Sequence, residues 1–178
     1  MLLEAIGANC LMISAAGLDT ERVLEALLRA HLDPRNLVLV VGTASEMELR
    51  LAEALGLPSP AAQKSTNYDE GGVVFVTARV LVVDALRERV PLANVTGILL
   101  VRAHGILAQE AFALRLFRQR NSTGFVCAVS DAPYRFSVHN IRKIMRTTFC
   151  DNLLLWPRQV TCKINGVNIE FSKRRIIF

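Results

Sequence analysis

The chain has 178 residues, of which 52% are hydrophobic and 21% are charged, and its formal net charge is +5. This length is enough for one domain with a buried core, and the composition excludes an intrinsically disordered chain. No apolar run reaches the roughly 18 residues of a membrane-spanning helix, and the N-terminus lacks the pattern of a secretory signal. We therefore expect a protein that neither crosses a membrane nor is secreted.

Short apolar runs, typical of buried strands, alternate along the chain with segments whose apolar residues recur at helical spacing. The apolar runs predict strands over residues 9–15, 37–41, 73–77, 97–101, 125–129 and 153–156. The helical spacing predicts helices over residues 19–31, 45–55, 79–89, 109–120 and 138–149. Asp19 or Thr20 is expected to cap the first helix, and Ser45 with Glu48 has the spacing of a capping box for the second.

Two of these helices have faces that we expect to pack inward. Phe112, Leu116 and Phe117 lie on one side of the helix over 109–120. Val138, Ile141 and Met145 do so on the helix over 138–149. Strands with little polar alternation, separated by amphipathic helices, predict an α/β fold of three layers: a mostly parallel sheet with helices on both faces. In such folds ligands bind at the carboxyl ends of the strands.

The fourth predicted strand ends in Val101-Arg102-Ala103-His104. This block resembles the Asp-Glu-Ala-His motif of superfamily 2 helicases, with Val101 in place of the metal-binding Asp and Arg102 in place of the water-activating Glu. The first strand-to-helix turn resembles a nucleotide loop and retains Gly17, Asp19 and Thr20 without a lysine. A working phosphate loop needs that lysine and a glycine-rich backbone. The resemblance of the two motifs implies a fold of the P-loop, RecA-like type. Because the lysine and the two acids are missing, we expect no nucleotide or metal to bind.

Histidines and cysteines offer little for catalysis. His104 follows a buried strand, and a structural role is favoured over that of a catalytic base because no nucleophile lies near it in the sequence. The four cysteines, Cys10, Cys127, Cys150 and Cys162, have no metal-ligand spacing. Reduced, buried thiols are favoured over disulfides. We expect no catalytic residue and no metal ligand in the chain.

The basic residues are the strongest candidates for a ligand site. Residues 1–114 contain 9 Lys and Arg against 13 Asp and Glu, whereas residues 115–178 contain 12 against 3. Such an excess favours a polyanionic partner, most plausibly nucleic acid, although a solvated surface without a ligand stays an equal alternative. The candidates are predicted to lie on the outer sides of two helices: Arg115, Arg118, Arg120, Arg142, Lys143 and Arg146.

Three blocks carry a family resemblance: GGVVFVTARVLVVDALRERVP, VTGILLVRAHG and QEAFALRLFRQRNSTGF. Over roughly residues 2–158 the chain resembles the N-terminal helicase-like region, the first RecA-like lobe, of the XPF family of structure-specific DNA-repair endonucleases. The resemblance implies a helicase-like module without ATP hydrolysis that binds DNA junctions and repair scaffold proteins. It also adds Arg79 as a DNA-binding candidate, because Thr77-Ala78-Arg79 resembles a motif that contacts single-stranded DNA in active helicases.

The resemblance further implies a nuclear protein that acts in nucleotide excision repair, interstrand crosslink repair and recombination. Family members carry a nuclease domain, which uses magnesium or manganese, and a tandem helix-hairpin-helix domain that binds a small non-catalytic partner. Neither domain is recognisable in this chain, so we expect no cofactor and no enzymatic activity here. Two alternatives stay open, namely a protein-interaction scaffold and a truncated isoform without DNA affinity of its own.

The end of the chain departs from the family. Residues 159–178 share none of its blocks, so we divide the chain into a lobe over residues 1–158 and a tail over residues 159–178. The tail is expected to be either disordered or a β-hairpin, with strands over 160–164 and 167–171 around the turn Asn165-Gly166. We interpret it as the alternative end of a truncated product.

Overall fold

The computed structural model describes residues 5–15, 17–58, 68–156, 161–164, 167–170 and 176–177, with side chains up to residue 156. One sheet of seven strands has the order β3-β2-β4-β5-β1-β6-β9. Its neighbouring strands are parallel except for β9, which pairs antiparallel with β6. The main strands are β1 (Cys10–Ser14), β2 (Leu37–Val41), β3 (Gly72–Phe75), β4 (Gly97–Val101), β5 (Phe125–Ser130) and β6 (Asn152–Trp156).

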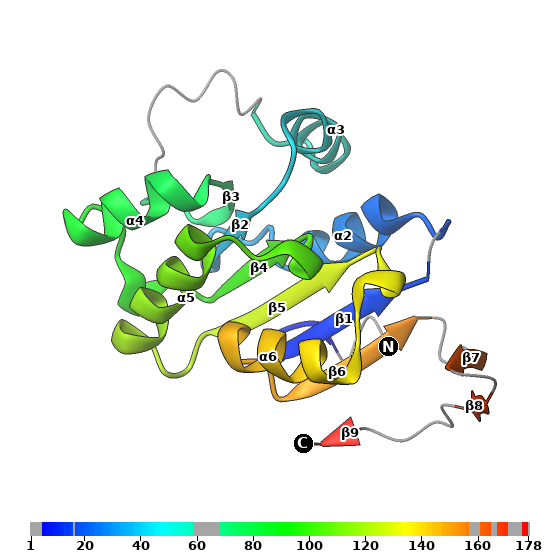
Figure 1. Ribbon diagram of the computed structural model, residues 1–178. Coiled ribbons are helices and arrows are strands. Elements are labelled where there is room, and N and C mark those ends of the chain that lie inside the picture. Colours follow the sequence, from blue (N-terminus) through cyan, green and yellow to red (C-terminus); the bar gives the residue numbers. More distant parts are fainter. Residues whose placement is uncertain are drawn as a thin grey trace.

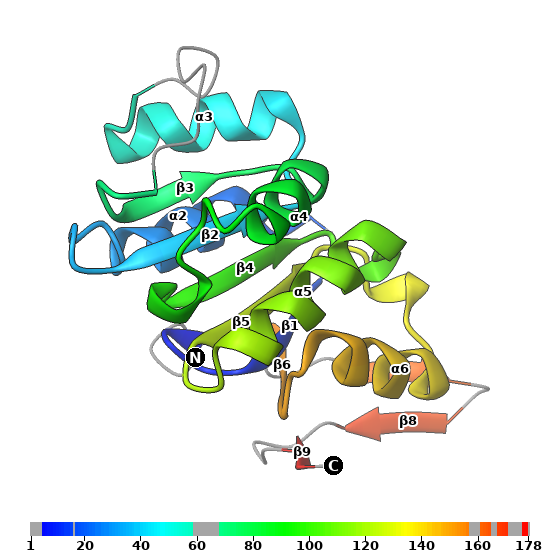
Figure 2. The ribbon, with the colours of Figure 1, turned by 90° about the vertical axis from the view of Figure 1, so that its left-hand side faces the viewer.

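Helices cover both faces of this sheet (Figures 1 and 2). One face packs on α2 (Thr20–Arg29) and α3 (Ser45–Leu55), which contribute Leu24, Leu28 and Leu51 to its core. The other face packs on the remaining α-helices, whose core residues include Leu81, Phe117 and Ile144. These helices are α4 (Ala78–Leu86), α5 (Ala108–Arg120) and α6 (Val138–Thr148).

The predicted three-layer α/β fold is confirmed. Each predicted strand and helix occurs, with ends that differ by at most a few residues. The central strands β1, β2, β4 and β5 are buried along their whole length, because helices cover the sheet on both sides. Strands that are covered on both faces are mostly apolar, which explains why short apolar runs predicted them. Short 3-10 helices within the described residues complete several connections, namely η2 (Leu92–Asn94), η3 (Ala103–Gly105) and η4 (Pro133–Arg135).

Some local predictions were wrong. Ser45 is the first residue of α3 and not its N-cap, a position that Ala44 occupies without a side-chain bond. The Glu48 carboxylate accepts a hydrogen bond from the Thr43 hydroxyl at 2.5 Å, and this contact replaces the predicted capping box. The first helix is capped by Asp19, whose carboxylate accepts from the backbone N–H of Arg22 at 3.2 Å.

Two aromatic or apolar positions face outward, contrary to prediction. Phe112 on α5 is 44% exposed and Val138 on α6 is 63% exposed. Val138 is the first residue of α6, and the buried residues of this helix lie in its second half. Phe117 on α5 and Met145 on α6 are buried as predicted, and Ile144 on α6 is buried as well.

In the tail, β7 (Thr161–Ile164) and β8 (Val167–Glu170) pair antiparallel with Ile164 opposite Val167. The predicted turn residues Asn165 and Gly166 lie outside the described residues. The strand β9 (Ile176–Ile177) adds to the edge of the main sheet beside β6. The division of the chain at residue 158 stays a prediction. Among the described residues, no helix combines the length and the apolar character needed to cross a membrane.

Candidate functional sites at the two rims of the sheet

The parallel strands β1 to β6 give the sheet two distinct rims. We call the rim at which these strands end the carboxyl rim, and the rim at which they begin the amino rim. Since β1, β4 and β5 lie side by side in register, their last residues Ser14, Val101 and Ser130 meet at the carboxyl rim. This is the rim at which folds of this class bind their ligands.

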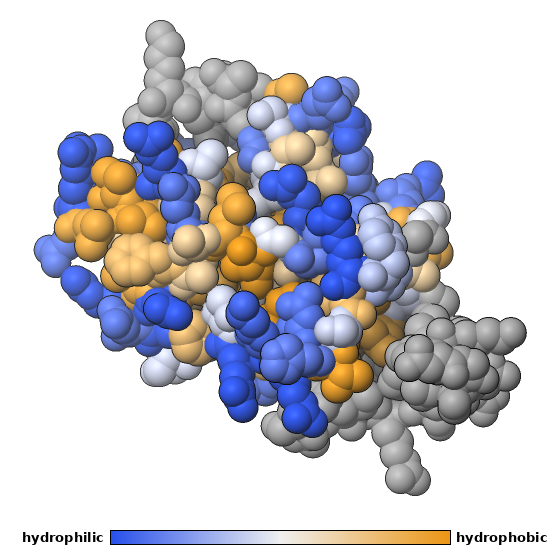
Figure 3. Space-filling model, viewed as in Figure 1, coloured by the Kyte–Doolittle hydropathy of each residue, from blue (hydrophilic) through white to orange (hydrophobic). Residues whose placement is uncertain are grey.

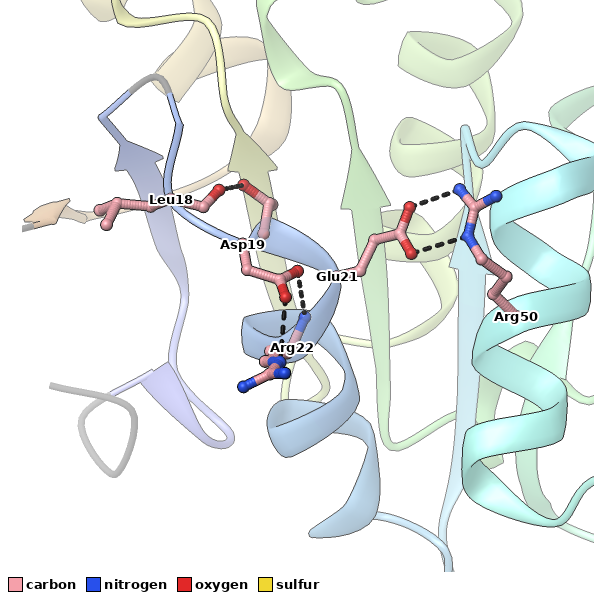
Figure 4. Close-up of polar contacts among 6 residues, drawn as sticks. Leu18, Asp19, Glu21, Arg22 and Arg50 are labelled. Carbon is pink, nitrogen blue, oxygen red and sulfur yellow. Dashed lines mark hydrogen bonds and ion pairs between the residues drawn. The ribbon is translucent and has the colours of Figure 1, made fainter.

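At the carboxyl rim, the N-terminus of α2 is occupied by the side chains of the chain itself (Figure 4). The Asp19 carboxylate caps the helix and also lies 3.0 Å from Nε of Arg22. The Glu21 carboxylate receives two hydrogen bonds from the Arg50 guanidinium of α3, at 2.5 Å and 2.8 Å. The bond from Arg50 holds the pKa of Glu21 below its ordinary value. A phosphate would need this helix N-terminus, and carboxylates stand there instead.

A chain of hydrogen bonds joins the three motif positions beside this helix. The Thr20 hydroxyl lies 3.1 Å from the Ser14 hydroxyl, which donates to the Ser130 carbonyl oxygen at 3.2 Å. The Ser130 hydroxyl lies 2.7 Å from Nδ1 of His104 and accepts from the backbone N–H of Ala132 at 3.2 Å. The predicted structural role of His104 thus has a concrete partner. Ser14 and Ser130 are buried, and the hydroxyl of each forms hydrogen bonds within the chain.

The surroundings of His104 favour its neutral form. Burial lowers the pKa of its imidazole from 6.5, and the neighbouring Arg135 and Arg102 lower it further against the opposing effect of Asp131. The Ser130 hydroxyl beside Nδ1 can either donate to a neutral imidazole or accept from it.

Arg102 turns away from the nucleotide loop. It has a left-handed backbone with φ of 59°, and its Nε donates to the Gly42 carbonyl oxygen at 3.0 Å. Glu110 is a buried carboxylate near this rim, and it accepts from the backbone N–H of Leu107 at 2.7 Å as a cap of α5. Among the described residues, no three potential metal-binding side chains of His, Cys, Asp or Glu lie together.

The described cysteines are buried and free, as predicted for Cys10, Cys127 and Cys150. The hydrogen bond from Cys10 and burial together raise the pKa of the Cys127 thiol, and burial raises the pKa of Cys150 to about 12. Thiols of this kind are poor nucleophiles and poor metal ligands. The side chain of Cys162 lies outside the described residues.

The amino rim carries a cationic cavity of about 810 Å³ between the C-terminal ends of α5 and α6. Helices that cross between parallel strands run back along the sheet, so their C-termini reach the rim where the strands begin. We call this cavity the α5–α6 pocket. The residues that line it are Asn9, Arg118, Ser122, Arg142, Met145, Arg146, Phe149, Cys150 and Asp151.

Arg118 was predicted on the outer side of α5, and this placement was wrong. Its guanidinium is half-buried and donates to the Gly124 carbonyl oxygen and to Oδ1 of Asn9, which also accepts from the backbone N–H of Val126. It lies over the rings of Phe117 and Phe149, 5.4 Å and 6.0 Å from their centroids. Burial lowers the pKa of Arg118 below its ordinary value. Arg118 therefore positions the start of β1 and β5 as well as lining the pocket.

The remaining candidates do not form one site. Arg115 and Lys143 are exposed on α5 and α6 but do not line the pocket. Arg120 is exposed and lies 3.6 Å from the Glu88 carboxylate. Arg79 lies at the start of α4, toward the carboxyl rim, where it lines a hollow with Val83 and Phe112. The structure thus brings together Arg118, Arg142 and Arg146 only.

Several residues of both rims escaped the sequence analysis. Ser14 and Asn9 were unremarkable in the sequence because each is a single polar residue at the end of an apolar run. The usable signal was their place: a polar residue that directly precedes or ends a buried parallel strand lies on a rim of the sheet.

Curated relatives identify the kind of protein to which this chain is similar, although no family model matches it. The DNA repair endonuclease XPF of Drosophila melanogaster is 39% identical over 89% of this chain and 18% of its own length. That of Mus musculus is 39% identical over 88% of this chain and 19% of its own length. The DNA repair protein RAD1 of Saccharomyces cerevisiae is 35% identical over 62% of this chain. The chain thus spans about a fifth of the length of the XPF relatives.

A solved structure supports the fold. The helicase domain of Pyrococcus furiosus Hef superposes with a TM-score of 0.70 at 17% sequence identity, over 86% of this chain and 36% of that one. At this identity the similarity supports the three-layer, RecA-like fold alone.

Proposed function

Because this chain belongs to the XPF family of DNA repair proteins, we propose that it forms a helicase-like lobe that binds DNA at junctions of single and double strands without hydrolysing ATP. We place this lobe in the nucleus, in nucleotide excision repair, interstrand crosslink repair and recombination, where it also binds repair scaffold proteins. We assign no cofactor to the lobe itself.

One observation carries the proposal: polar side chains at the carboxyl rim bond to one another, while three arginines line a cavity at the amino rim. Two acids are needed at the end of β4 for metal binding and water activation, and Val101 and Arg102 occupy these places. Carboxylates at the N-terminus of α2 also oppose a bound phosphate.

The basic residues of α5 and α6 supply what binding to a DNA backbone requires. Arg115, Lys143 and Arg146 are exposed, and within residues 5–15, 17–58 and 68–156 none of them forms an ion pair. Cations of this kind bind phosphates by releasing condensed counterions, so affinity falls steeply with salt. Hydrophilic side chains gather over α6 in the lower centre of Figure 3.

Fluorescence anisotropy with labelled fork, duplex and single-stranded DNA across a salt series tests this proposal. We expect the fork to bind most tightly, and the double variant Arg115→Ala with Lys143→Ala to reduce the slope of log affinity against log salt by about 2. Arg22→Ala is the matched control, since it removes an exposed arginine from the opposite side of the sheet. Absence of binding to all three DNAs at low salt would contradict DNA binding, and DNA-stimulated ATP turnover would contradict a lobe without hydrolysis.

A second candidate function, a protein-interaction scaffold, is favoured by an apolar surface. Val80, Val83 and Leu86 of α4 are exposed, as are Leu107 and Phe112 at the start of α5, and Val83 lines a hollow together with Phe112. This surface is visible at the left of Figure 3. Exposed apolar groups that gather in one place are typical of protein contacts. If the lobe bound no DNA, it would act in repair by binding partner proteins through this surface.

A further inference from the structure

The α5–α6 pocket lies at the rim opposite to the degenerate nucleotide loop. Asn9 precedes β1, Ser122 precedes β5 and Asp151 precedes β6, so these residues form its wall on the side of the sheet. The C-terminal ends of α5 and α6 form the other walls. A cavity of about 810 Å³ falls within the range of pockets that bind small molecules or parts of larger ones.

Arg118 gives this pocket a cation that forms no ion pair with the described side chains, although Asp151 of the same wall interacts with it electrostatically. Its two hydrogen bonds go to uncharged acceptors, the Gly124 carbonyl and the Asn9 amide oxygen. Within the part of the chain that the structure describes with side chains, Arg118 lies within ion-pair distance of no carboxylate. A half-buried charge is costly unless it is paired, and a guanidinium has more N–H donors than these two bonds use.

Arg146 adds a second cation at the same pocket. It is exposed in the last turn of α6. The helix dipole alone favours a cation there, but it does not require one that borders a cavity beside Arg118. Asp151 supplies a single opposing carboxylate on the wall, so the pocket keeps an excess of positive charge over its lining residues.

The pocket also has an apolar wall. Met145 is buried in the core beneath it, and Phe149 is half-buried at the end of α6 in a left-handed conformation with φ of 56°. The left-handed turn ends α6 at Phe149, a residue whose ring lines the pocket. Aromatic rings of this kind stack on nucleobases irrespective of the base, whereas phosphates bind arginines.

We propose that the α5–α6 pocket binds one nucleotide of a single DNA strand, with its phosphate against Arg118 and Arg146 and its base against Phe149. This inference rests on the proposed function and specifies which DNA structure the lobe selects and where. An acidic peptide matches the cations but has no flat ring for Phe149, so the combination of both features favours the nucleotide.

Anisotropy with three labelled probes of about 12 units tests the inference: an oligothymidylate, an abasic strand with the same phosphates, and an oligoglutamate peptide. Arg146→Ala should weaken binding of the oligothymidylate about tenfold, the effect of losing one charge-assisted contact. Phe149→Leu keeps an apolar side chain and removes the ring. It should weaken the oligothymidylate about tenfold and leave the abasic strand unchanged.

Arg22→Ala is the matched control, because Arg22 is an exposed cation on the opposite side of the sheet that does not line the pocket. If Arg146→Ala and Phe149→Leu bind the oligothymidylate as tightly as Arg22→Ala does, the pocket is not the site, although DNA binding itself stands. Tighter binding of oligoglutamate than of oligothymidylate would overturn the nucleotide in favour of an acidic peptide. Thermal melts of each variant confirm that it is folded, and Arg146→Gln repeats the test should Arg146→Ala melt early.

Discussion

The two rims of this sheet are built from the same strands and yet differ in what they leave for a ligand. At the carboxyl rim, Ser14, Thr20, Ser130 and His104 bond to one another, and Arg102 bonds to the Gly42 carbonyl. At the amino rim, Arg118 is bonded to uncharged groups and borders an open cavity with Arg146. The comparison teaches that two rims of one sheet can differ in how far their polar and charged side chains are already bonded within the chain.

The largest effect is expected from Asn121→Ala, which removes the support beneath the amino rim. The buried Asn121 amide donates to the Leu92 and Val95 carbonyls and accepts from the Gly124 N–H at 2.6 Å. Its loss leaves several buried polar groups unsatisfied and should lower the free energy of unfolding by about 3 kcal/mol. Urea unfolding measures this loss.

Asn94→Ala is the control for Asn121→Ala, because Asn94 is an exposed residue of the same loop region. It should change the free energy of unfolding by less than about 0.5 kcal/mol. Equal losses for the two variants would mean that the bonds of Asn121 do not support the rim.

Ser130→Ala separates the two rims directly. It deprives the His104 imidazole and the Ala132 N–H of their buried partner and should lower the free energy of unfolding by about 2 kcal/mol. Affinity for DNA should stay unchanged, because the carboxyl rim is not the proposed binding site. Urea unfolding and anisotropy give the two readings, and weakened DNA binding in a folded variant would blur the distinction between the rims.

Ser45→Ala is the matched control for Ser130→Ala. Its exposed side chain makes no capping bond, so we expect a change within about 0.5 kcal/mol. If Ser45→Ala lowered the free energy of unfolding as much as Ser130→Ala, Ser45 would cap α3 as the sequence predicted.

Acid should weaken the fold through one histidine near each rim. Burial lowers the pKa of His31, which stacks on Phe125 with ring centroids 5.0 Å apart, and lowers that of His104. Below a pH of about 6.5 the unfolded chain takes up these protons before the folded one does, so the free energy of unfolding falls as pH falls through that value.

Urea midpoints between pH 7.5 and 5.5, at roughly one unit on either side of the ordinary histidine pKa, measure this dependence. His104→Gln should flatten the part that arises at the carboxyl rim. Stability that rises as the pH is lowered through this range would contradict the direction of both shifts.

The smallest effect is expected from Arg50→Ala. It breaks the bidentate contact with Glu21 that joins α2 to α3 (Figure 4). The pair is solvent-exposed, where water and salt screen most of its energy. We expect a slight drop in the urea midpoint that disappears in high salt, and a large drop that persists in salt would show that the pair clamps the carboxyl rim.

The sequence predicted which helices carry the cationic residues of the candidate site but did not predict how those residues are arranged. Cationic residues on α5 and α6 were identified from their sequence spacing, because the helical period is a local property. That spacing could not reveal the inward turn of Arg118, because its partner Asn9 is 109 residues away. The outward position of Phe112 likewise depends on how α5 packs on the sheet. The helical period alone does not say which residues at the edge of the apolar face are buried.

The sequence by itself determined the order of strands and helices and the loss of the acids at Val101 and Arg102. These properties depend on apolar runs and residue identities that neighbouring positions reveal. Only the tertiary structure decided that Ser14, Ser130 and His104 are linked by hydrogen bonds at one rim. It also decided that Arg118 and Arg146 line a pocket at the other rim. Contacts of this kind depend on which strands lie side by side, and the order β4-β5-β1-β6 joins segments that are far apart along the chain.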